Sequence, residues 1–364
     1  MRDMRSLLAQ VLIPLSVILV AAIFVAAGAT DPPRWTVQSS GMDTNLRAVS
    51  IAEFTDSRQG PAPVVWASGS NGVILQSKDV GKTWQRLRVQ SGETLDFRSI
   101  QAFDARKAYV MSIGDAGNSR IYKTSDGGGN WTLEYADKRK EFFLDALVCV
   151  SEMECFAVGD PLEGKFVIVH TRDGQNWTQL PTDHMPAALA NEGAFAASGT
   201  CLAVFDQRDI YFVTGGPAAR LFRSSDAGYS WAVSGTPIVS GNVSSGIFSI
   251  AVQDQTLVIV GGDYKQVGNP HDVAAFSADQ GKTWKLAQQQ PGGFRSAVAR
   301  VDERILVAVG PNGEDASDDG GAHWKHTDSL NLNAVNVFRH DYVWAVGPNG
   351  TIARLQSPPL ASLH

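Results

Sequence analysis

The sequence predicts an all-β protein, and three observations support that class. The 364 residues include 35 glycines and 9 tryptophans, a content typical of many short strands joined by tight turns. Short apolar runs lie between turn residues, as at 166–170 and 305–310. A turn motif that contains tryptophan also recurs along the chain. Hydrophobic residues make up 44% and charged residues 19%, which is the balance of a packed globular protein and excludes global disorder or a coiled coil.

The N-terminus carries a targeting segment. Arg2 and Arg5 precede an apolar stretch over residues 7–27, and the small residues from 27 to 29 offer a cleavage site. We predict that residues 1–29 are a signal peptide, with an uncleaved membrane anchor as the alternative because the apolar stretch is long enough to span a bilayer. The remainder is exported in either case. We therefore expect a periplasmic or secreted protein, or one anchored to the inner membrane and facing the periplasm.

Charge and cysteine content limit the partners and cofactors. The net charge is −6 and no basic run follows the N-terminus, so we expect no nucleic-acid partner. The spacing of cysteines and histidines predicts no metal and no cofactor. Cys149 and Cys155 flank a turn-like segment, and two alternatives stand: a disulfide across a hairpin, or two buried thiols. Cys201 lies in an apolar run and is expected in the core.

The repeated motif reads Ser/Thr-x-Asp-x-Gly-x-x-Trp, and we call it the box. A hairpin turn explains this pattern, because aspartate accepts hydrogen bonds from turn amides, glycine adopts positive φ and tryptophan packs beneath the turn. We therefore interpret the box aspartates as structural. Five boxes are complete and one is a residue shorter, and their aspartates are Asp79, Asp126, Asp173, Asp226, Asp279 and Asp319.

The spacing of the boxes predicts a seven-bladed β-propeller. Box tryptophans recur about every 40 to 54 residues, and four strand-like runs fit each interval, as in propeller blades. After the last box three runs remain, at 332–338, 342–347 and 351–355, so the last blade lacks a strand. Trp35 begins a segment like those at the box tryptophans and can complete this blade. We predict one propeller over residues 30–356, a tail at 357–364 and a monomer.

The boxes resemble the Asp-box repeats of sialidase-like and related β-propellers. Further stretches, at 142–147, 156–166, 193–200 and 345–350, are similar to the photosystem II stability/assembly factor family and its non-photosynthetic bacterial relatives. This resemblance extends from Trp35 to Leu355. It implies an exported seven-bladed propeller that acts as an assembly or stability factor for membrane complexes. It also implies an arginine patch used for contact with a protein partner.

Aligned inner strands yield candidate binding residues. In five segments a bulky apolar residue precedes a polar one, and period two places these polar side chains on equivalent faces of their strands. We predict a basic patch near the channel that binds an acidic or carboxylate-bearing partner, formed by Arg47, Arg98, Arg295 and Asn333. The fifth polar side chain is Asp145. The alternative is that each arginine pairs with a carboxylate and only fills the channel.

A non-catalytic, protein-binding propeller is the function that these observations favour, with no catalytic residue assigned. A sialidase-like or other glycan-active hydrolase is the alternative, because three register-matched arginines could bind a carboxylate and paired acids are not visible in a sequence. Some relatives carry an oxidoreductase label, but no redox motif occurs here. Asp115, Asp160 and Asp263 each follow a glycine in a hairpin, and we interpret them as turn aspartates.

Overall fold

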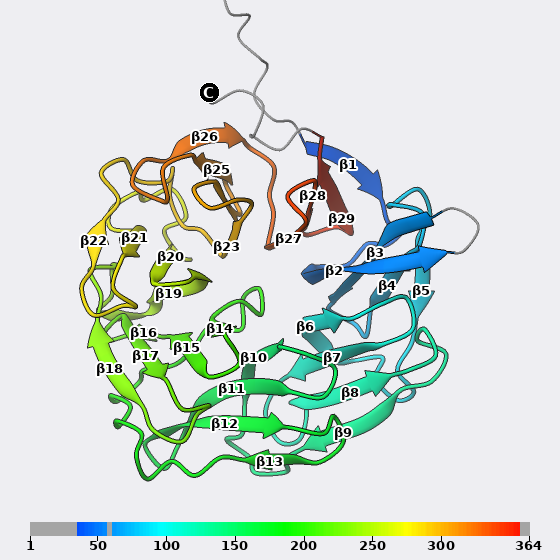
Figure 1. Cartoon of the computed structure of the whole chain (residues 1–364), viewed down its shortest axis with the longest axis horizontal. Coiled ribbons are helices and arrows are strands. Elements are labelled where there is room, and N and C mark those ends of the chain that lie inside the picture. The colour runs from blue at the N-terminus through cyan, green and yellow to red at the C-terminus, as the bar shows by residue number, and fades with distance from the viewer. Residues whose placement is uncertain (1–34, 57–59, 357–364) are drawn as a thin grey trace, which may run out of the picture. The chain divides into compact units, whose positions relative to one another are not determined.

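Residues 35–56 and 60–356 are described by the computed structural model, and they form a ring of seven antiparallel sheets (Figure 1). The predicted seven-bladed β-propeller is confirmed. The inner strand of each blade contacts the inner strands of its two neighbours around the whole ring. In this part of the chain no helix has the length and apolar character needed to cross a membrane. The predicted signal segment and C-terminal tail lie outside the described residues.

The four main strands of each of six blades follow one another along the chain, in the order inner to outer strand. Blade 1 comprises β2 Leu46–Asp56, β3 Gly60–Gly69, β4 Ile74–Ser77 and β5 Gln85–Leu87. Blade 2 comprises β6 Asp96–Ala102, β7 Ala108–Ile113, β8 Arg120–Thr124 and β9 Thr132–Ala136. Blade 3 comprises β10 Leu144–Cys149, β11 Cys155–Leu162, β12 Lys165–Thr171 and β13 Trp177–Gln179. Blade 4 comprises β14 Leu202–Phe205, β15 Asp209–Val213, β17 Arg220–Ser224 and β18 Ala232–Gly235. Blade 5 comprises β19 Asn242–Gln253, β20 Thr256–Asp263, β21 Ala274–Ser277 and β22 Lys285–Leu286, and the short β16 Gly215–Gly216 pairs with β19. Blade 6 comprises β23 Ala297–Arg300, β24 Leu306–Gly310, β25 Gly313–Ser317 and β26 Lys325–Asp328.

Blade 7 combines the two ends of the chain. It comprises β27 Ala334–Phe338, β28 Tyr342–Val346, β29 Thr351–Leu355 and, outermost, β1 Trp35–Ser39. Strand β1 pairs antiparallel with β29 in a register that sets Trp35 opposite Leu355. The prediction that the N-terminal strand completes the last blade is therefore confirmed. This pairing covers the edge of β29 and joins the two ends of the chain within one blade.

The hydrophobic core lies between neighbouring sheets. Many of the middle strands are apolar on both faces, and β3, β7 and β24 are buried over most of their length. Large aromatic side chains pack against one another between neighbouring blades. Trp66 of blade 1, for example, meets Trp131 of blade 2 edge to face at 6.4 Å between ring centroids.

The boxes form hydrogen-bonded turns at the outer hairpins. In the last box, Asp319 Oδ1 accepts hydrogen bonds from the amides of Ala322 and His323 at 3.0 Å each and from the Ser317 hydroxyl at 2.9 Å. The Gly321 amide donates to the same hydroxyl at 2.9 Å, and Gly321 has φ of 98°. Equivalent amide-to-carboxylate bonds occur in the other boxes, at Asp79, Asp126, Asp173, Asp226 and Asp279.

Replacing Asp319 by alanine should lower the free energy of unfolding by about 1 to 3 kcal/mol, because two turn amides and a hydroxyl lose their acceptor. Denaturant titration measures this loss. Asp319→Asn retains an Oδ1 acceptor and should lose less. A D319A protein that unfolds like the wild type but no longer binds its partner would contradict a structural role for the box.

The cysteines lie in blades 3 and 4. Cys149 and Cys155 are opposite one another in the β10–β11 register and are joined by a disulfide across that hairpin. Of the two alternatives for this pair, the structure contains the crosslink. Cys201 is a fully buried thiol that packs in the core at the start of blade 4.

Candidate functional site

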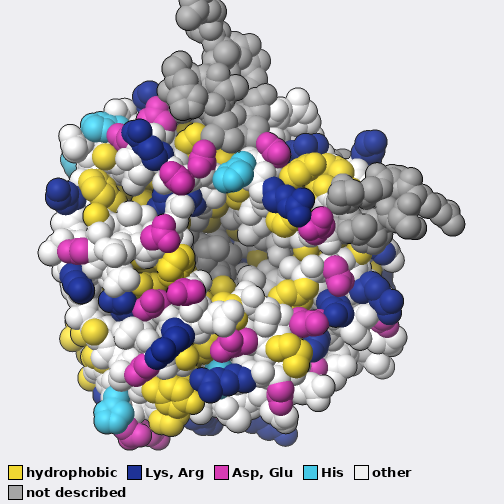
Figure 2. All heavy atoms as spheres, in the orientation of Figure 1, with side chains coloured by type: hydrophobic (Ala, Val, Ile, Leu, Met, Phe, Trp, Pro, Cys, Tyr) yellow, Lys and Arg dark blue, Asp and Glu magenta, His cyan; other side chains and the backbone are white. Residues whose placement is uncertain are grey.

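A cavity of about 570 Å³ lies where the inner strands converge on the channel. Side chains from blades 1, 2, 3, 5, 6 and 7 line it, so the site exists only when the ring is assembled. Space-filling of one face shows the ring hollowed at its centre, with acidic and basic side chains intermixed around the hollow (Figure 2). The polar residues of the cavity are Arg47, Arg98, Asp145, Asp160, Tyr264, Ser296 and Asn333. We call it the channel cavity.

A loop over residues 193–199, between β13 and β14, closes one side of the channel cavity. Its Phe195 ring stacks on Phe248 of β19 at 3.9 Å between centroids and 6° between planes. The Ala196 carbonyl accepts a hydrogen bond of 2.8 Å from Arg98 of blade 2, and the Ser198 hydroxyl donates to the Ser296 carbonyl of blade 6 at 2.8 Å. The loop therefore bridges blades on opposite sides of the ring and provides an aromatic wall.

Arg47 and Arg98 lie side by side on the innermost strands of blades 1 and 2. Arg98 is bound to Asp96, with Nε and Nη2 both at 2.8 Å from Oδ2. Burial, together with the like charge of Arg98 and against the opposing effect of Asp96, lowers the pKa of Arg47 to about 10, so it is still a cation at neutral pH. Within the described residues the buried Nε of Arg47 has no hydrogen-bond partner. Arg47 is therefore the cation with unused bonding capacity in this cavity.

The other two residues of the predicted patch, Arg295 and Asn333, are already bound to other groups of the protein. Arg295 is fully buried, outside the cavity lining, and donates from Nε to Asp315 Oδ2 at 2.7 Å. Its prediction as part of an accessible patch is wrong, because a carboxylate in the next hairpin of blade 6 draws the side chain into the core. Asn333 does line the cavity, but its amide donates to Asn45 Oδ1 and the Leu46 carbonyl at 2.7 Å each and so connects blade 7 to blade 1.

Two carboxyl groups of blade 3, Asp145 on β10 and Asp160 on β11, face the same cavity, and we call them the acid pair. Burial, then the negative charge of Asp160, raises the pKa of Asp145 well above its usual range, against the opposing effect of Arg98. Burial also raises the pKa of Asp160 to about 6, although its Oδ1 accepts a hydrogen bond from the Ala194 amide at 3.2 Å. The cavity therefore has a basic side and an acidic side, rather than the purely basic patch predicted.

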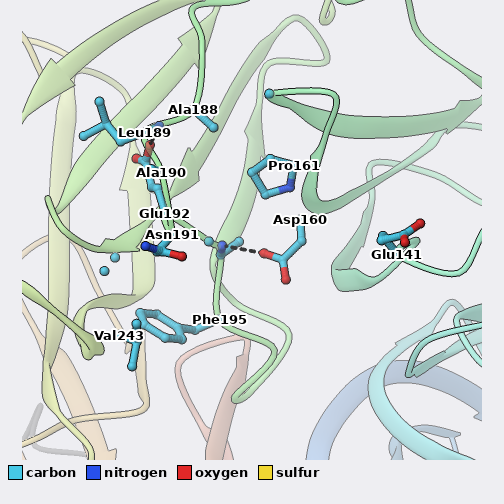
Figure 3. A pocket seen from close by; sticks show the side chains of 15 residues that line it. Glu141, Asp160, Pro161, Ala188, Leu189, Ala190, Asn191, Glu192, Phe195 and Val243 are labelled. Carbon is cyan, nitrogen blue, oxygen red and sulfur yellow. Dashed lines mark hydrogen bonds between the residues drawn. The ribbon is translucent and has the colours of Figure 1, made fainter.

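A second cavity of about 630 Å³ adjoins the first and shares Asp160, Ala194 and Phe195 with it. The dashed line from Asp160 in Figure 3 marks the hydrogen bond that its carboxylate accepts from the Ala194 amide. Glu192 also lines this cavity but is engaged: its Oε1 accepts hydrogen bonds from the Thr214 hydroxyl at 2.7 Å and from Arg220 Nε at 2.8 Å. Asp160 is thus reached from both cavities.

Sequence reasoning missed the role of Asp160, which it interpreted as a turn aspartate. The sequence does contain one indication of this position, because the hydrophobic run before Gly159 continues directly into Asp160 and Pro161. A charged side chain at the end of a buried strand is costly unless it has a partner or a function. Among the described residues no group of three His, Cys, Asp or Glu side chains is suited to a metal ion.

No protein-family model matches this chain, and no curated protein matches it either. Solved structures do. The chain is similar to "YCF48 bound to D1 peptide", with a TM-score of 0.64 and 16% identity over 90% of this chain and 99% of that one. It is similar to YCF48 from Cyanidioschyzon merolae, with a TM-score of 0.63 and 16% identity over 88% and 98%. The designed protein Ika8 follows at 0.51 and 12%, over 88% and 98%. At these identities the similarity shows the fold.

Proposed function

We propose that the protein is an exported, non-catalytic propeller that binds an acidic or carboxylate-bearing segment of a protein partner in the channel cavity. Through this binding it acts as an assembly or stability factor for a membrane or envelope complex. The apolar, small-residue N-terminal segment supports export. The solved structure of YCF48 with the D1 peptide supports polypeptide binding by a propeller of this shape.

Arg47 is the observation on which this proposal depends. Its guanidinium is charged at neutral pH, largely buried at an open cavity, and holds an Nε donor without a partner in the described chain. A buried donor of this kind gains most when a carboxylate supplies the missing hydrogen bond, because charge-assisted bonds are roughly twice as strong as neutral ones. Aromatic rings from blades 5 and 6 give the same cavity an apolar wall, with Phe248 and Phe294 edge to face at 4.6 Å.

A glycan-active hydrolase is the second candidate, because the acid pair places two carboxyl groups with raised pKa in one cavity. A sialidase-type site needs several guanidinium groups free to hold a substrate carboxylate. Here Arg98 is bound to Asp96 and Arg295 to Asp315, which favours binding over catalysis. Hydrolysis of fluorogenic glycosides that is abolished in D160N would favour the enzyme instead.

An array of heptapeptides, in which each Asp or Glu peptide is paired with its Asn or Gln counterpart, tests the binding proposal. The wild type should retain acidic peptides over their amides, and Arg47→Met should weaken that binding about tenfold or more because it removes a charged donor. Binding should also weaken with salt, since part of the attraction is screened. Arg86→Met is the matched control, because Arg86 is exposed on the outer strand β5.

Equal retention of acidic peptides by wild type and R47M would contradict the proposal. The role in assembly is tested separately, by co-purification of the intact exported protein with membrane complexes. We expect the same complexes with wild type and R86M and their loss with R47M. Complexes that R47M still retains would show that docking uses another surface.

A further inference from the structure

The positive and negative side chains of the channel cavity come from different blades. Its cations, Arg47 and Arg98, come from blades 1 and 2, and its acid pair comes from blade 3. A segment with a single negative charge would use only one side of this cavity. The acid pair on the opposite side would then have no ligand, and its carboxyl groups would remain buried without a cationic partner.

Asp145 gives the strongest indication that the acidic side of the cavity lacks a hydrogen-bond donor. Its side chain is 1% exposed, it lines the cavity, and its Oδ2 atom has no hydrogen-bond partner among the described residues. Most buried polar atoms in native proteins are hydrogen-bonded, and an unsatisfied one costs stability. A donor from outside the chain would satisfy it.

The neighbours of the acid pair do not provide that donor. Arg98 is the cation near Asp145, but its Nε and Nη2 bind Asp96 and its Nη1 binds the Ala196 carbonyl. Asp115 adds negative charge near Asp160, and exposed Glu141 lines the adjoining cavity. Apart from Arg98, the charges that act on the pKa values of the pair are acidic, namely Asp115 and the two carboxyl groups themselves, and they favour a cation on this side of the cavity.

We propose that the acid pair is a cation subsite that takes a lysine or arginine side chain of the bound segment. The inference deepens the proposed function: the segment carries a carboxylate for Arg47 and a basic side chain for Asp145 and Asp160. The rings of Phe195 and Tyr264, which line the same cavity, can pack along the aliphatic part of such a side chain while its charged head reaches the carboxylates. The site thus selects segments of mixed charge.

The cation n-butylammonium, which mimics the end of a lysine side chain, is the direct probe. Its binding to the full propeller can be followed by NMR at the Ala194 amide, which donates to Asp160. We expect saturable binding, with 1-pentanol, a neutral probe of similar size, binding at least about tenfold more weakly. Asp145→Asn with Asp160→Asn should weaken n-butylammonium about tenfold or more, and both changes keep the side-chain shape.

Asp115→Asn is the matched control, because Asp115 is an exposed acid that raises the pKa of Asp160 without lining the cavity. It should change the affinity for n-butylammonium by no more than about twofold. An affinity that is unchanged in D145N/D160N, or a wild type that binds 1-pentanol as tightly as the cation, would overturn the inference. Unfolding curves of each variant show whether the fold is retained.

The pH dependence supplies a readout that a merely structural role would not give. A cation binds the pair more tightly once Asp160 is ionised, and the pKa of Asp160 is about 6, so affinity for n-butylammonium should increase about tenfold from pH 5 to pH 7.5. Arg47, with a pKa of about 10, stays charged over this range, so carboxylate binding should not show this increase. A flat profile for the cation would contradict ionisation of the pair as its binding form.

The peptide array separates this inference from the proposed function. Replacing lysine by norleucine in retained peptides should weaken binding to wild type and R47M alike, but not to D145N/D160N. If R47M shows no loss of acidic peptides while the lysine effect persists, the proposed function fails and the cation subsite remains. If acidic peptides depend on Arg47 and lysine has no effect, only the cation subsite fails.

Discussion

Trp35→Ala should lower the free energy of unfolding by about 3 to 5 kcal/mol, one of the two largest effects we expect from a single change. Trp35 is 9% exposed and packs in the apolar cluster between blades 6 and 7 with Val307 and Leu355. Its strand also closes the ring by pairing with β29. Removal of the indole ring therefore creates a cavity beside the β1–β29 pairing, which joins two segments far apart in the sequence. Denaturant unfolding and the melting temperature measure the effect.

Two variants divide this effect into its parts. Trp35→Phe keeps most of the apolar volume but loses the indole N–H that donates to Glu314 of blade 6, so about 1 to 3 kcal/mol should be lost. Val37→Ala changes an exposed residue of the same strand and should cost less than about 0.5 kcal/mol. A W35A protein that unfolds like V37A would contradict closure by β1.

Asp315→Asn should lower the free energy of unfolding by about 3 to 5 kcal/mol, because it leaves the Arg295 guanidinium buried without its counter-ion. Asp315 is 1% exposed, and its carboxylate also accepts hydrogen bonds from the Gly292 amide at 3.2 and 3.3 Å. Arg295 keeps only neutral partners in the variant, the Asn312 side chain and the Phe294 carbonyl. Equilibrium unfolding of the single variant measures this penalty.

The double change Arg295→Met with Asp315→Leu is the informative control. Removing both charges leaves no unpaired ion, so most of the loss in D315N should be recovered. The double variant should also retain acidic peptides like the wild type, because Arg295 lies outside the channel cavity. Loss of peptide binding in a stable double variant would return Arg295 to the binding surface.

The sequence by itself determined the architecture. The hydrogen bonds that each box aspartate accepts come from residues no more than four positions away, as from the His323 amide to Asp319, so this part of the turn is encoded locally. Repetition of that local signal gives the number of blades, and only three strand-like runs from residue 332 onward show that the last blade must take one strand from elsewhere. Period-two alternation likewise placed Arg47, Arg98 and Asp145 on inner strands around one cavity.

Only the tertiary structure decided which charged side chains of the channel cavity are free to bind a ligand. Register gives the face of a strand but not the neighbour that a long side chain reaches, and Arg295 turns to Asp315 in the next hairpin of its own blade. Asp160 joins Asp145 because β11 runs antiparallel to β10 and returns to the channel, which no local pattern encodes. Loop 193–199 bridges the ring through contacts to residues about a hundred positions away, such as Arg98 and Ser296. Long-range packing and pairing of charges, rather than strand propensity, therefore set the chemistry of the site.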